Sequence, residues 1–323
     1  MRYVILGAGA IGCAIGGRLF EHGHDVVLVA RGAQEAALAG RGLELRDADR
    51  TVKLPIASTS SPAEAGFDEG DIAILATKTQ HSEALLAQLA ACAPASTPVV
   101  CAQNGVENER LALRRFSNVQ AMCVILPATY LEPGVVEVSH GPLTGILDVG
   151  RYPSGVDDVT RRIAADLNAS SFESRADAKV MAQKYLKLQS NVGNAIEAAS
   201  GTRTDEPAAA ELWRLARAEA ARCFEAAGIE VADADEDARR RTALGPHRAV
   251  GGRPRPGGSS WQSLVRGTGN IEADWLNGEI VLLGRLHGIA TPVNELLRST
   301  ANRMVVDKLA PGSIPAADLL AQL

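Results

Sequence analysis

The sequence predicts an α/β fold in which a parallel sheet covered by helices occupies the N-terminal half and an all-helical domain follows. Short β-branched runs alternate with Ala- and Leu-rich stretches in the first half, which is typical of strands joined by helices. From about residue 176 onward, apolar residues recur at helical spacing. The 323 residues are about twice the length of a typical domain, so we expect one domain over 1–175 and another over 176–323.

The expected strands of the first half are short runs rich in Val, Ile and Leu. They cover residues 3–6, 26–30, 72–77, 98–102 and 120–126, with helices at 11–22 and 82–92. Beyond residues 133–134 the pattern changes to a pair of strands, 135–139 and 145–149, and then a helix at 156–167. A parallel sheet with helices on its faces accounts for the alternation.

Long helices dominate the second half. Apolar spacings of three and four predict helices over residues 176–199, 207–227 and 259–287. The stretch 251–258 interrupts them, and its glycines and prolines disfavour both helix and strand. We therefore predict a mobile loop there.

Composition excludes several classes of function. The hydrophobic fraction of 46% and the charged fraction of 22% are those of a globular protein, and a net charge of -5 argues against a nucleic acid partner. No apolar run approaches the roughly 18 residues that a membrane span requires, and no leader pattern precedes the first strand, so we expect a cytoplasmic protein without a membrane partner. The five cysteines are scattered and form no CxxC pair, which predicts no metal site.

A glycine-rich motif follows the first expected strand and opens the next helix. Its residues are Gly7, Ala8, Gly9, Ala10, Ile11 and Gly12. Gly7 suits a tight turn, Gly9 the close approach of a pyrophosphate, and Gly12 the packing of helix against strand. The first N–H groups of the helix are suited to bind the pyrophosphate. This strand-turn-helix context predicts a Rossmann-type dinucleotide-binding domain at the N-terminus.

The residue that follows the second strand indicates which dinucleotide binds. An acidic residue at this place accepts hydrogen bonds from the ribose 2′-hydroxyl of NAD, but here the strand is followed by Arg31. Because a guanidinium pairs with a phosphate, we expect NADP(H). The alternative is that Arg31 is a solvated surface residue.

Polar residues also follow two other expected strands. One group is Lys78-Thr79-Gln80 and the other is Gln103-Asn104-Gly105-Val106. Because ligands bind beyond the carboxyl ends of parallel strands, we expect both groups at the same edge of the sheet. The alternative is that both are merely polar loops.

The helical half carries a line of polar residues. Lys187 and Asn191 are one turn apart, and Asn194 lies about two turns from Lys187, so all three are expected on nearly the same helix face. Such a line suits a small polar substrate, but a solvated face has the same pattern. Taken alone, the pattern predicts Ser259 or Ser260 as a helix cap and Glu272 as a surface charge.

Along nearly its whole length, the chain resembles the ketopantoate reductase (2-dehydropantoate 2-reductase) family. The order and spacing of several motifs carry this resemblance. They are the Gly-rich motif, Val29-Ala30-Arg31, Lys78-Thr79-Gln80, Gln103-Asn104-Gly105-Val106, the aromatic-x-Lys-Leu-x-x-Asn pattern at Tyr185–Asn191, Ser260, Ile271–Gly278 and Thr291-Pro292-Val293-Asn294.

The resemblance implies an NADPH-dependent enzyme that reduces a 2-oxoacid, ketopantoate or a close analogue, in the cleft between its two domains. Pantothenate biosynthesis is the pathway that it implies. Carried over by position, the implied roles are Lys187 as general acid, Asn191 and Ser260 at the substrate, Asn104 at both substrate and cofactor, Glu272 near Lys187 and the nicotinamide ribose, and Tyr130 beside the cofactor through its backbone.

The sequence departs from the family pattern at two places. The family usually has an asparagine eight residues after the lysine, but this chain has Ala195 there and Asn194 one place earlier. A further substrate-binding asparagine is absent near Thr204 and Asp205. The exact 2-oxoacid therefore stays open, and so do a related opine or hydroxyacid dehydrogenase, a catalytically silent NADP(H)-binding regulator and a homodimer.

Overall fold

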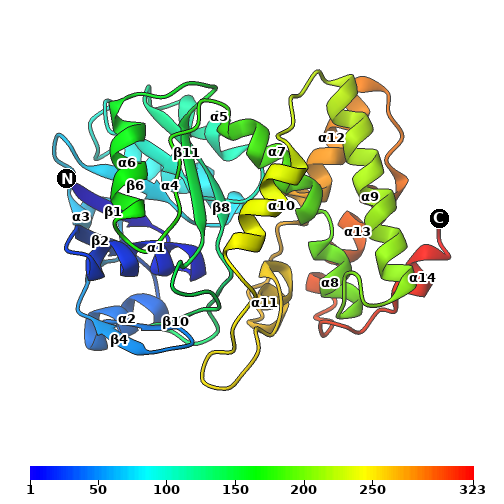
Figure 1. The fold of residues 1–323 in the computed structure, drawn as a ribbon, viewed down its shortest axis with the longest axis horizontal. Coiled ribbons are helices and arrows are strands. Elements are labelled where there is room, and N and C mark those ends of the chain that lie inside the picture. The colour runs from blue at the N-terminus through cyan, green and yellow to red at the C-terminus, as the bar shows by residue number, and fades with distance from the viewer. The chain divides into compact units, whose positions relative to one another are not determined.

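The computed structural model describes all 323 residues (Figure 1). The chain packs as two compact units, which we call the sheet unit and the helical unit. The sheet unit comprises Met1–Gln103, Glu107–Met181 and Ala234–Arg255, and the helical unit comprises Asn104–Val106, Ala182–Asp233 and Pro256–Leu323. The predicted fold class is confirmed. The single domain boundary near residue 175 stays a prediction. The two units describe which residues pack together, and this does not define where a functional domain ends.

A seven-stranded sheet forms the centre of the sheet unit. Its order is β11-β8-β7-β6-β1-β2-β5, and β11 alone runs antiparallel to its neighbour. The strands are β1 (Arg2–Leu6), β2 (Asp25–Val29), β5 (Ala57–Thr59), β6 (Ile72–Leu75), β7 (Val99–Cys101), β8 (Val119–Ile125) and β11 (Ile146–Arg151). The strand order reverses at β1: β2 and β5 lie on one side of β1, and β6 lies on its other side. In sheets of this kind, ligands bind at the point of reversal, which is here between β1 and β6.

Helices cover both faces of this sheet. They are α1 (Ala10–Glu21), α2 (Ala33–Arg41), α3 (Pro62–Ala65), η1 (Thr79–His81), α4 (Ser82–Ala90), α5 (Asn108–Leu113), α6 (Asp158–Asn168) and α10 (Ala234–Ala243). Alternate residues of β1 belong to different cores: Ile5 packs in the cluster with α1, whereas Val4 and Leu6 pack in the cluster with α4. Strands buried on both faces explain the continuous apolar runs in the sequence.

A smaller sheet completes the sheet unit. Its order is β4 (Thr51–Leu54), β3 (Leu43–Arg46), β10 (Val135–Val138) and β9 (Ala128–Thr129). The expectation that the strands near residues 135 and 145 form a pair is therefore wrong. β10 pairs with β3 and β9 in the smaller sheet, whereas β11 pairs with β8 in the seven-stranded sheet. Nearness along the chain does not decide which strands pair.

The helical unit contains the residues of the second candidate site. Its elements include α7 (Val180–Asn191), α8 (Asn194–Ser200), α9 (Pro207–Ala226), α11 (Ser259–Val265), η2 (Ala273–Trp275), α12 (Asn277–His287), α13 (Pro292–Val306) and α14 (Ala316–Leu320). Two of the predicted long helices are broken. The first breaks at Gly193, and the second ends before Gly267 and Gly269, whose φ angles of 59° and 70° cannot continue a helix. Residues 251–258 contain no helix or extended strand, as predicted.

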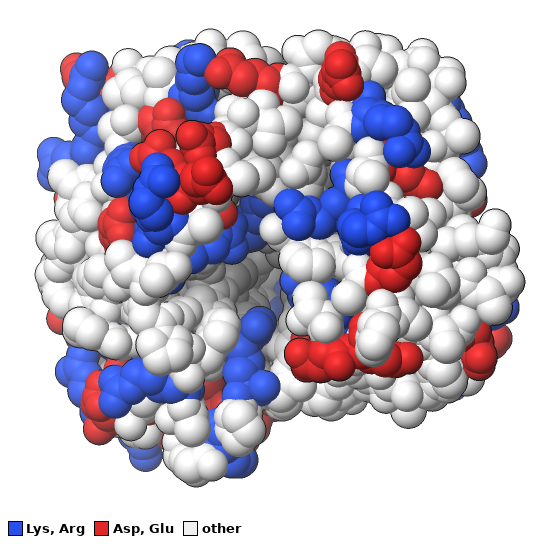
Figure 2. Space-filling model, turned by 45° about the vertical axis from the view of Figure 1, so that its right-hand side comes forward, with Lys and Arg blue, Asp and Glu red and all other residues white.

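The surface carries both signs of charge. Figure 2 shows Lys and Arg side chains beside Asp and Glu side chains on the face that it displays. Many of these neighbours are ion pairs, such as Arg248 with Asp49 and Arg298 with Asp274. No helix is both long and apolar enough to cross a membrane.

Candidate active site

The Gly-rich loop connects β1 to α1 and is attached to β2. Both Gly7 N and Ala8 N donate to Val29 O at 3.1 Å. Gly7 has a φ of +107°, and a Cβ there would lie 2.6 Å from Thr77 Cγ2. A Cβ on Gly12 would lie 2.1 Å from Gly7 O. Only glycine therefore fits at these two positions, since the loop is closely packed against β6 and against itself.

Gly9 differs from the other two glycines because its open side faces free space. A Cβ built on Gly9 would meet no atom within 4 Å. Gly9 caps α1 without a side-chain hydrogen bond, and the first intrahelical bond runs from Cys13 N to Gly9 O at 2.9 Å. The N–H groups of Ala10 and Ile11 precede that first bond, and such groups favour an anion. This geometry fits a pyrophosphate.

Arg31 lies just past the carboxyl end of β2, next to the Gly-rich loop. In the sheet register Leu6 of β1 is opposite Val29 of β2, so the chain segments after both strands leave the sheet at one edge. Arg31 is exposed, and Gly32 after it has a φ of +61° before α2 begins. The guanidinium is thus placed where a group attached to a bound nucleotide could meet it.

The two polar turns after β6 and β7 are held together by buried side chains. Gln103 Nε2 donates to Thr77 O at 2.7 Å and to Ser82 Oγ at 2.8 Å. Asn108 accepts from Ser82 Oγ at 2.7 Å and donates to Thr79 Oγ1 at 3.0 Å. The prediction that these turns share one sheet edge is confirmed, because β6 and β7 are parallel neighbours.

Two further predicted cofactor residues lie on this framework, and a third follows a strand of the smaller sheet. Lys78 precedes η1 and Gln80 lies within it. Tyr130 follows β9 directly, four residues before Gly134 with its φ of +77°. Their proposed contacts with the cofactor stay predictions.

In the helical unit, the structure joins two predicted site residues directly. Lys187 Nζ donates to Asn104 Oδ1 at 2.7 Å, although the residues are 83 positions apart. Asn104 belongs to a short segment after β7 that packs with the helical unit. Gly105 explains the close packing, since its φ is +77° and a Cβ there would lie 3.1 Å from Trp275 O.

Asn191 supplies an unused acceptor one turn beyond Lys187. Both residues lie on α7, as predicted. Asn191 Oδ1 is buried and has no hydrogen-bond partner within the protein. Because a buried amide oxygen without a partner costs free energy, this atom is suited to accept a hydrogen bond from a ligand.

Asn194 does not continue that line of polar residues, and the expectation of a shared helix face is wrong. α7 ends at Asn191 and α8 begins at Asn194. The break lies at Gly193, where a Cβ would be 2.8 Å from Trp213 Cδ1. Asn194 Oδ1 instead accepts from Arg203 Nη2 at 3.1 Å, and the same Nη2 is 2.9 Å from Glu197 Oε2.

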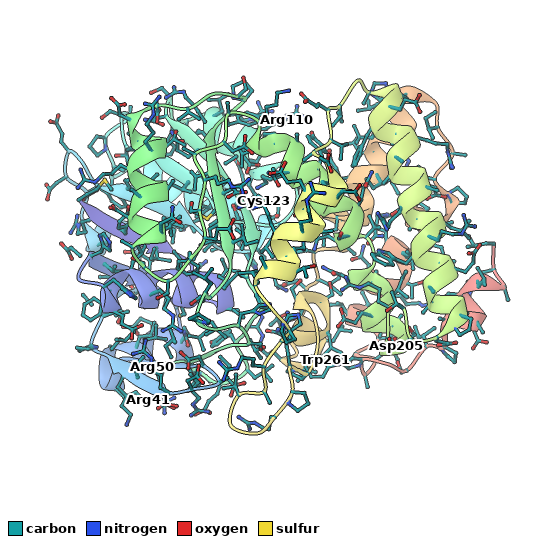
Figure 3. All side chains as sticks on the ribbon, viewed as in Figure 1. Arg41, Arg50, Arg110, Cys123, Asp205 and Trp261 are labelled. Atoms are coloured by element: carbon teal, nitrogen blue, oxygen red, sulfur yellow. The ribbon has the colours of Figure 1, made fainter.

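Ser260 is buried in the first turn of α11, next to Trp261 (Figure 3). The cap of this helix is Gly258 and neither Ser259 nor Ser260, so the prediction of a serine cap is wrong. Gly258 N donates to Glu197 Oε1 at 2.9 Å, and a Cβ on Gly258 would lie 2.6 Å from Glu197 Oε2. A carboxylate from α8 thus occupies the place of a side-chain cap and fixes the turn that carries Ser260.

Glu272 is also buried, with 7% of its surface exposed, so the reading as a surface charge is wrong. It precedes η2, and its carbonyl oxygen accepts from Trp275 N at 3.0 Å and Leu276 N at 3.1 Å. This turn places the carboxylate on the segment that also approaches Gly105.

A buried polar network behind the site was not predicted. Glu219 of α9 accepts from Val293 N and Asn294 N, both at 2.9 Å, and from Asn294 Nδ2 at 2.7 Å. Asn277 Nδ2 donates to Asn294 Oδ1 at 3.1 Å and to Val192 O at 3.0 Å. The network therefore supports the junction of α7 and α8. The late motifs that contain Asn277 and Asn294 were its only sequence signal.

Comparisons with known proteins agree with this architecture. Residues 3–154 match the family model described as ketopantoate reductase PanE/ApbA, and residues 179–304 match the model of its C-terminal part. The 2-dehydropantoate 2-reductase of Pyrococcus horikoshii is 26% identical over 302 residues, which are 92% of this chain and 95% of that protein. Its counterpart from Archaeoglobus fulgidus is 28% identical over 302 residues, with the same two coverages.

Solved structures share the fold. The PanE/ApbA family ketopantoate reductase of Ralstonia eutropha JMP134 has a TM-score of 0.80 at 26% identity, covering 95% of this chain and 99% of that chain. A ternary structure of D-mandelate dehydrogenase with NADH and anilino(oxo)acetate has a TM-score of 0.81 at 20% identity, again covering 95% and 99%. The second likeness concerns the fold alone. The resemblance inferred from the motifs is confirmed by the two family models.

Proposed function

This chain belongs to the ketopantoate reductase family of oxidoreductases, and we propose that it reduces the keto group of a small 2-oxoacid with NADPH. The proposed substrate is ketopantoate or a close analogue, and the product is the 2-hydroxyacid. The observation that carries this proposal is the 2.7 Å contact between Lys187 Nζ and Asn104 Oδ1, with the unpartnered Asn191 Oδ1 one turn along α7. The proposed setting is pantothenate biosynthesis in the cytoplasm.

The sheet unit supplies the proposed cofactor site. The open side of Gly9 and the first N–H groups of α1 suit the pyrophosphate, and the exposed Arg31 suits a 2′-phosphate. When bound, NADPH supplies the hydride that the keto carbon receives. The remaining proposed cofactor residues are Lys78, Gln80 and Tyr130 in the sheet unit and Asn104 and Glu272 in the helical unit.

Lys187 is the proposed general acid. As the keto carbon gains hydride, its oxygen gains negative charge, and Lys187 Nζ donates a proton to that oxygen to complete the hydroxyl group. Asn104 Oδ1 accepts a hydrogen bond from one N–H group of the ammonium, which helps to fix the position of Nζ. The lysine then recovers a proton from water. In this proposal Glu272 stabilises the charged form of Lys187.

The other polar residues orient the substrate. Asn191 Oδ1 accepts a hydrogen bond from a hydroxyl group of the substrate, and Ser260 Oγ donates to its carboxylate. Glu197 supports Ser260 indirectly by binding Gly258 N. Asn194 is a weaker candidate, because its amide oxygen already accepts from Arg203.

One observation favours a second substrate class. Ala195 is buried and apolar where the family usually has an asparagine, and Asn194 is turned to Arg203. This side of the site therefore offers less hydrogen bonding than the family pattern, which suits a 2-oxoacid with a more apolar side chain. Reduction of such an acid is the reaction of a hydroxyacid dehydrogenase.

A substrate panel tests both candidates. The purified protein would be assayed with NADPH and with NADH against ketopantoate, straight-chain 2-oxoacids and an aryl 2-oxoacid that corresponds to mandelate. We expect turnover with NADPH and the highest kcat/KM for a branched 2-oxoacid. A preference for the aryl acid would support the second candidate. NADP(H) binding without turnover of any 2-oxoacid would contradict both and support a regulatory protein.

A further inference from the structure

Gln34 is a buried glutamine that links three separate segments around the Gly-rich loop. It lies in the first turn of α2, three residues after Arg31, and only 8% of its surface is exposed. Its Nε2 donates to Ala8 O at 2.8 Å and to Cys13 Sγ at 3.4 Å. Its Oε1 accepts from Gly134 N at 2.7 Å. Both ends of the side-chain amide are therefore used inside the protein.

The partners determine the orientation of this amide. Ala8 offers a carbonyl oxygen, which can only accept, and Gly134 offers an N–H, which can only donate. A reversed amide would place oxygen against oxygen and N–H against N–H. The side-chain amide of Gln34 can therefore connect Ala8 O, which needs a donor, with Gly134 N, which needs an acceptor.

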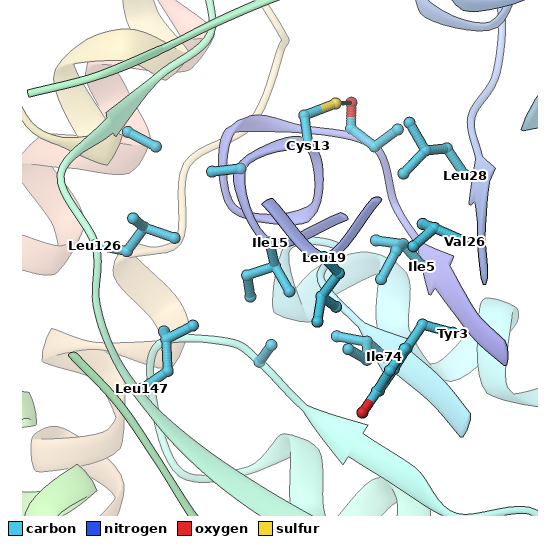
Figure 4. Close-up of a cluster of buried hydrophobic side chains, with 14 of the residues drawn as sticks. Tyr3, Ile5, Cys13, Ile15, Leu19, Val26, Leu28, Ile74, Leu126 and Leu147 are labelled. Atoms are coloured by element: carbon cyan, nitrogen blue, oxygen red, sulfur yellow. Dashed lines mark hydrogen bonds between the residues drawn. The ribbon is translucent and has the colours of Figure 1, made fainter. Parts of the chain in front are cut away.

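Cys13 makes a second contact with the same carbonyl oxygen. Its Sγ donates to Ala8 O at 3.2 Å, and Cys13 lies in the apolar core beside Ile15 and Leu19 of α1 (Figure 4). Burial raises the pKa of the Cys13 thiol to about 12, so the thiol keeps its proton at neutral pH. Ala8 O therefore accepts from two buried donors.

These two donors determine which way the Ala8–Gly9 peptide faces. The carbonyl oxygen is directed to the buried Cys13 and Gln34, whereas the Cβ direction of Gly9 is open. The Gly9 N–H donates to Gly7 O at 2.9 Å, so an anion on the open side meets the N–H groups of Ala10 and Ile11 and not the negative end of the Ala8 carbonyl dipole. Preset N–H donors bind an anion better than donors that must first rotate.

Gly134, which donates to Gln34, also packs against later residues of α2. A Cβ on Gly134 would lie 3.1 Å from Ala37 Cβ and from Arg41 Nε, so the loop before β10 packs closely on this helix. Arg41, at the end of α2 (Figure 3), donates through Nη2 to Pro133 O. α2 is thus attached to this loop at both ends, which restrains Arg31 just before it.

We propose that Gln34 is a positioning residue of the cofactor site, which presets the Ala8–Gly9 peptide and the start of α2 for a dinucleotide phosphate. This inference rests on the proposed function. It assigns to Gln34 an effect on cofactor affinity, with no direct contact to the cofactor and no effect on proton transfer.

The first test compares two glutamine-to-methionine variants. Gln34→Met keeps the length of the side chain and removes its hydrogen bonds. Gln120→Met is the matched control, because Gln120 is fully buried, its Oε1 accepts from Thr160 Oγ1 at 2.7 Å, and it lies near the amino end of β8, at the opposite edge of the sheet. We expect Gln34→Met to raise the Kd for NADP⁺ about tenfold, a loss typical of removed buried hydrogen bonds. The kcat at saturating NADPH stays unchanged, and the control keeps its Kd.

The second test uses Gln34→Glu and pH. A carboxylate at this position accepts from Gly134 N but repels Ala8 O, whereas the protonated acid donates to Ala8 O. The affinity of the variant for NADP⁺, divided by that of the wild type at each pH, should therefore recover as the pH falls from 8 to 5.5. The same ratio for Gln34→Met should stay flat. A purely structural role would not produce this recovery.

The outcomes separate this proposal from the proposed function. If the wild type binds NADP⁺, three outcomes would overturn the role of Gln34 and leave the proposed function intact. They are an unchanged Kd in Gln34→Met, an equal rise of the Kd in Gln120→Met, and no recovery of affinity at low pH in Gln34→Glu. A wild-type chain that binds neither NADP⁺ nor NAD⁺ would overturn the proposed function and this inference with it. Hydrogen exchange of residues 7–13, measured without cofactor, should be faster in Gln34→Met than in the control, and equal rates would also overturn the inference.

Discussion

The two candidate sites are built from different parts of the protein. In the sheet unit the groups suited to the pyrophosphate are backbone N–H groups and the open side of Gly9, all within residues 7–12. In the helical unit they are side chains from separate elements, and Lys187 and Asn104 meet although they are 83 positions apart. A backbone site is sensitive to an added Cβ, whereas a side-chain site is sensitive to a single truncation. Substitutions in the two sites should therefore fail in different ways.

The largest expected effect is that of Lys187→Met. If Lys187 is the general acid, its loss should reduce kcat by about 10²–10⁴-fold. The affinity for NADP⁺ should stay unchanged, because Lys187 is not part of the Gly-rich loop that we propose binds the pyrophosphate. Steady-state kinetics and titration with NADP⁺ measure the two quantities. Lys53→Met, at an exposed lysine on β4, is the control. Near-normal turnover in Lys187→Met would contradict the assignment.

Glu219→Ala tests the support of the helical site. Removing this carboxylate leaves the backbone N–H groups of Val293 and Asn294 without their acceptor, whereas Asn294 Nδ2 still donates to Ala216 O. The cost should be about 3 kcal/mol in the free energy of unfolding, because each buried unpaired donor costs about 1–3 kcal/mol. Chemical denaturation measures it. Glu211→Ala, at an exposed position of the same helix, should cost little, and equal losses would contradict the role of the network.

The same contrast between the sites explains what could be predicted from the sequence. The Gly-rich loop was predictable because all its parts lie in one short segment and each glycine has a steric reason. Lys187 and Asn191 were predictable as neighbours because they share one helix. Asn194 was misplaced because the break at Gly193 depends on Trp213, which is distant in sequence.

Buried polar residues were the other failure. Glu272 was interpreted as a surface charge and Glu219 was not noticed, since a single sequence does not show which polar residue meets a buried partner. Glu219 is buried because the start of α13 offers it N–H groups, and that packing is set by the tertiary structure. Gln34 was missed for the same reason: its partners Ala8 and Gly134 come from two distant turns.

Arg31→Ala tests the side-chain contact that we propose for the 2′-phosphate of the cofactor. We expect it to weaken NADPH binding by about 1.5–3 kcal/mol, the contribution of a charge-assisted hydrogen bond. NADH binding should be unchanged, because NADH has no 2′-phosphate. Titration with both cofactors measures the difference. Equal losses for NADPH and NADH would show that Arg31 does not discriminate between them.

Gly9→Ala and Gly12→Ala separate the two uses of glycine in the loop. A Cβ on Gly12 meets Gly7 O at 2.1 Å, so Gly12→Ala should lower stability by on the order of 1–3 kcal/mol and weaken NADP⁺ binding as well. A Cβ on Gly9 meets nothing, so Gly9→Ala should keep its Tm but bind NADP⁺ more weakly. Thermal unfolding and titration give both readings. An unchanged affinity in Gly9→Ala would show that the open side does not face the pyrophosphate.

The smallest expected effect concerns a histidine pair in the sheet unit, next to the loop that leads to Ser260, in which His140 is buried and His247 is exposed. The rings of His140 and His247 stack with centroids 4.6 Å apart. Burial lowers the pKa of both, and the nearby positive charge of Arg255 lowers each further. In the unfolded chain a histidine titrates near pH 6.5, so below that pH the unfolded state takes up protons that the folded pair resists. Stability should therefore be complete above about pH 6.5 and fall below it, mainly through the buried His140, by up to about 1 kcal/mol for each pH unit. His140→Gln should flatten this dependence between pH 7 and 5.5 in denaturation experiments, whereas His287→Gln, at an exposed position of the helical unit, should not. Equal slopes in the two variants would show that the pair does not contribute to the acid sensitivity of the sheet unit.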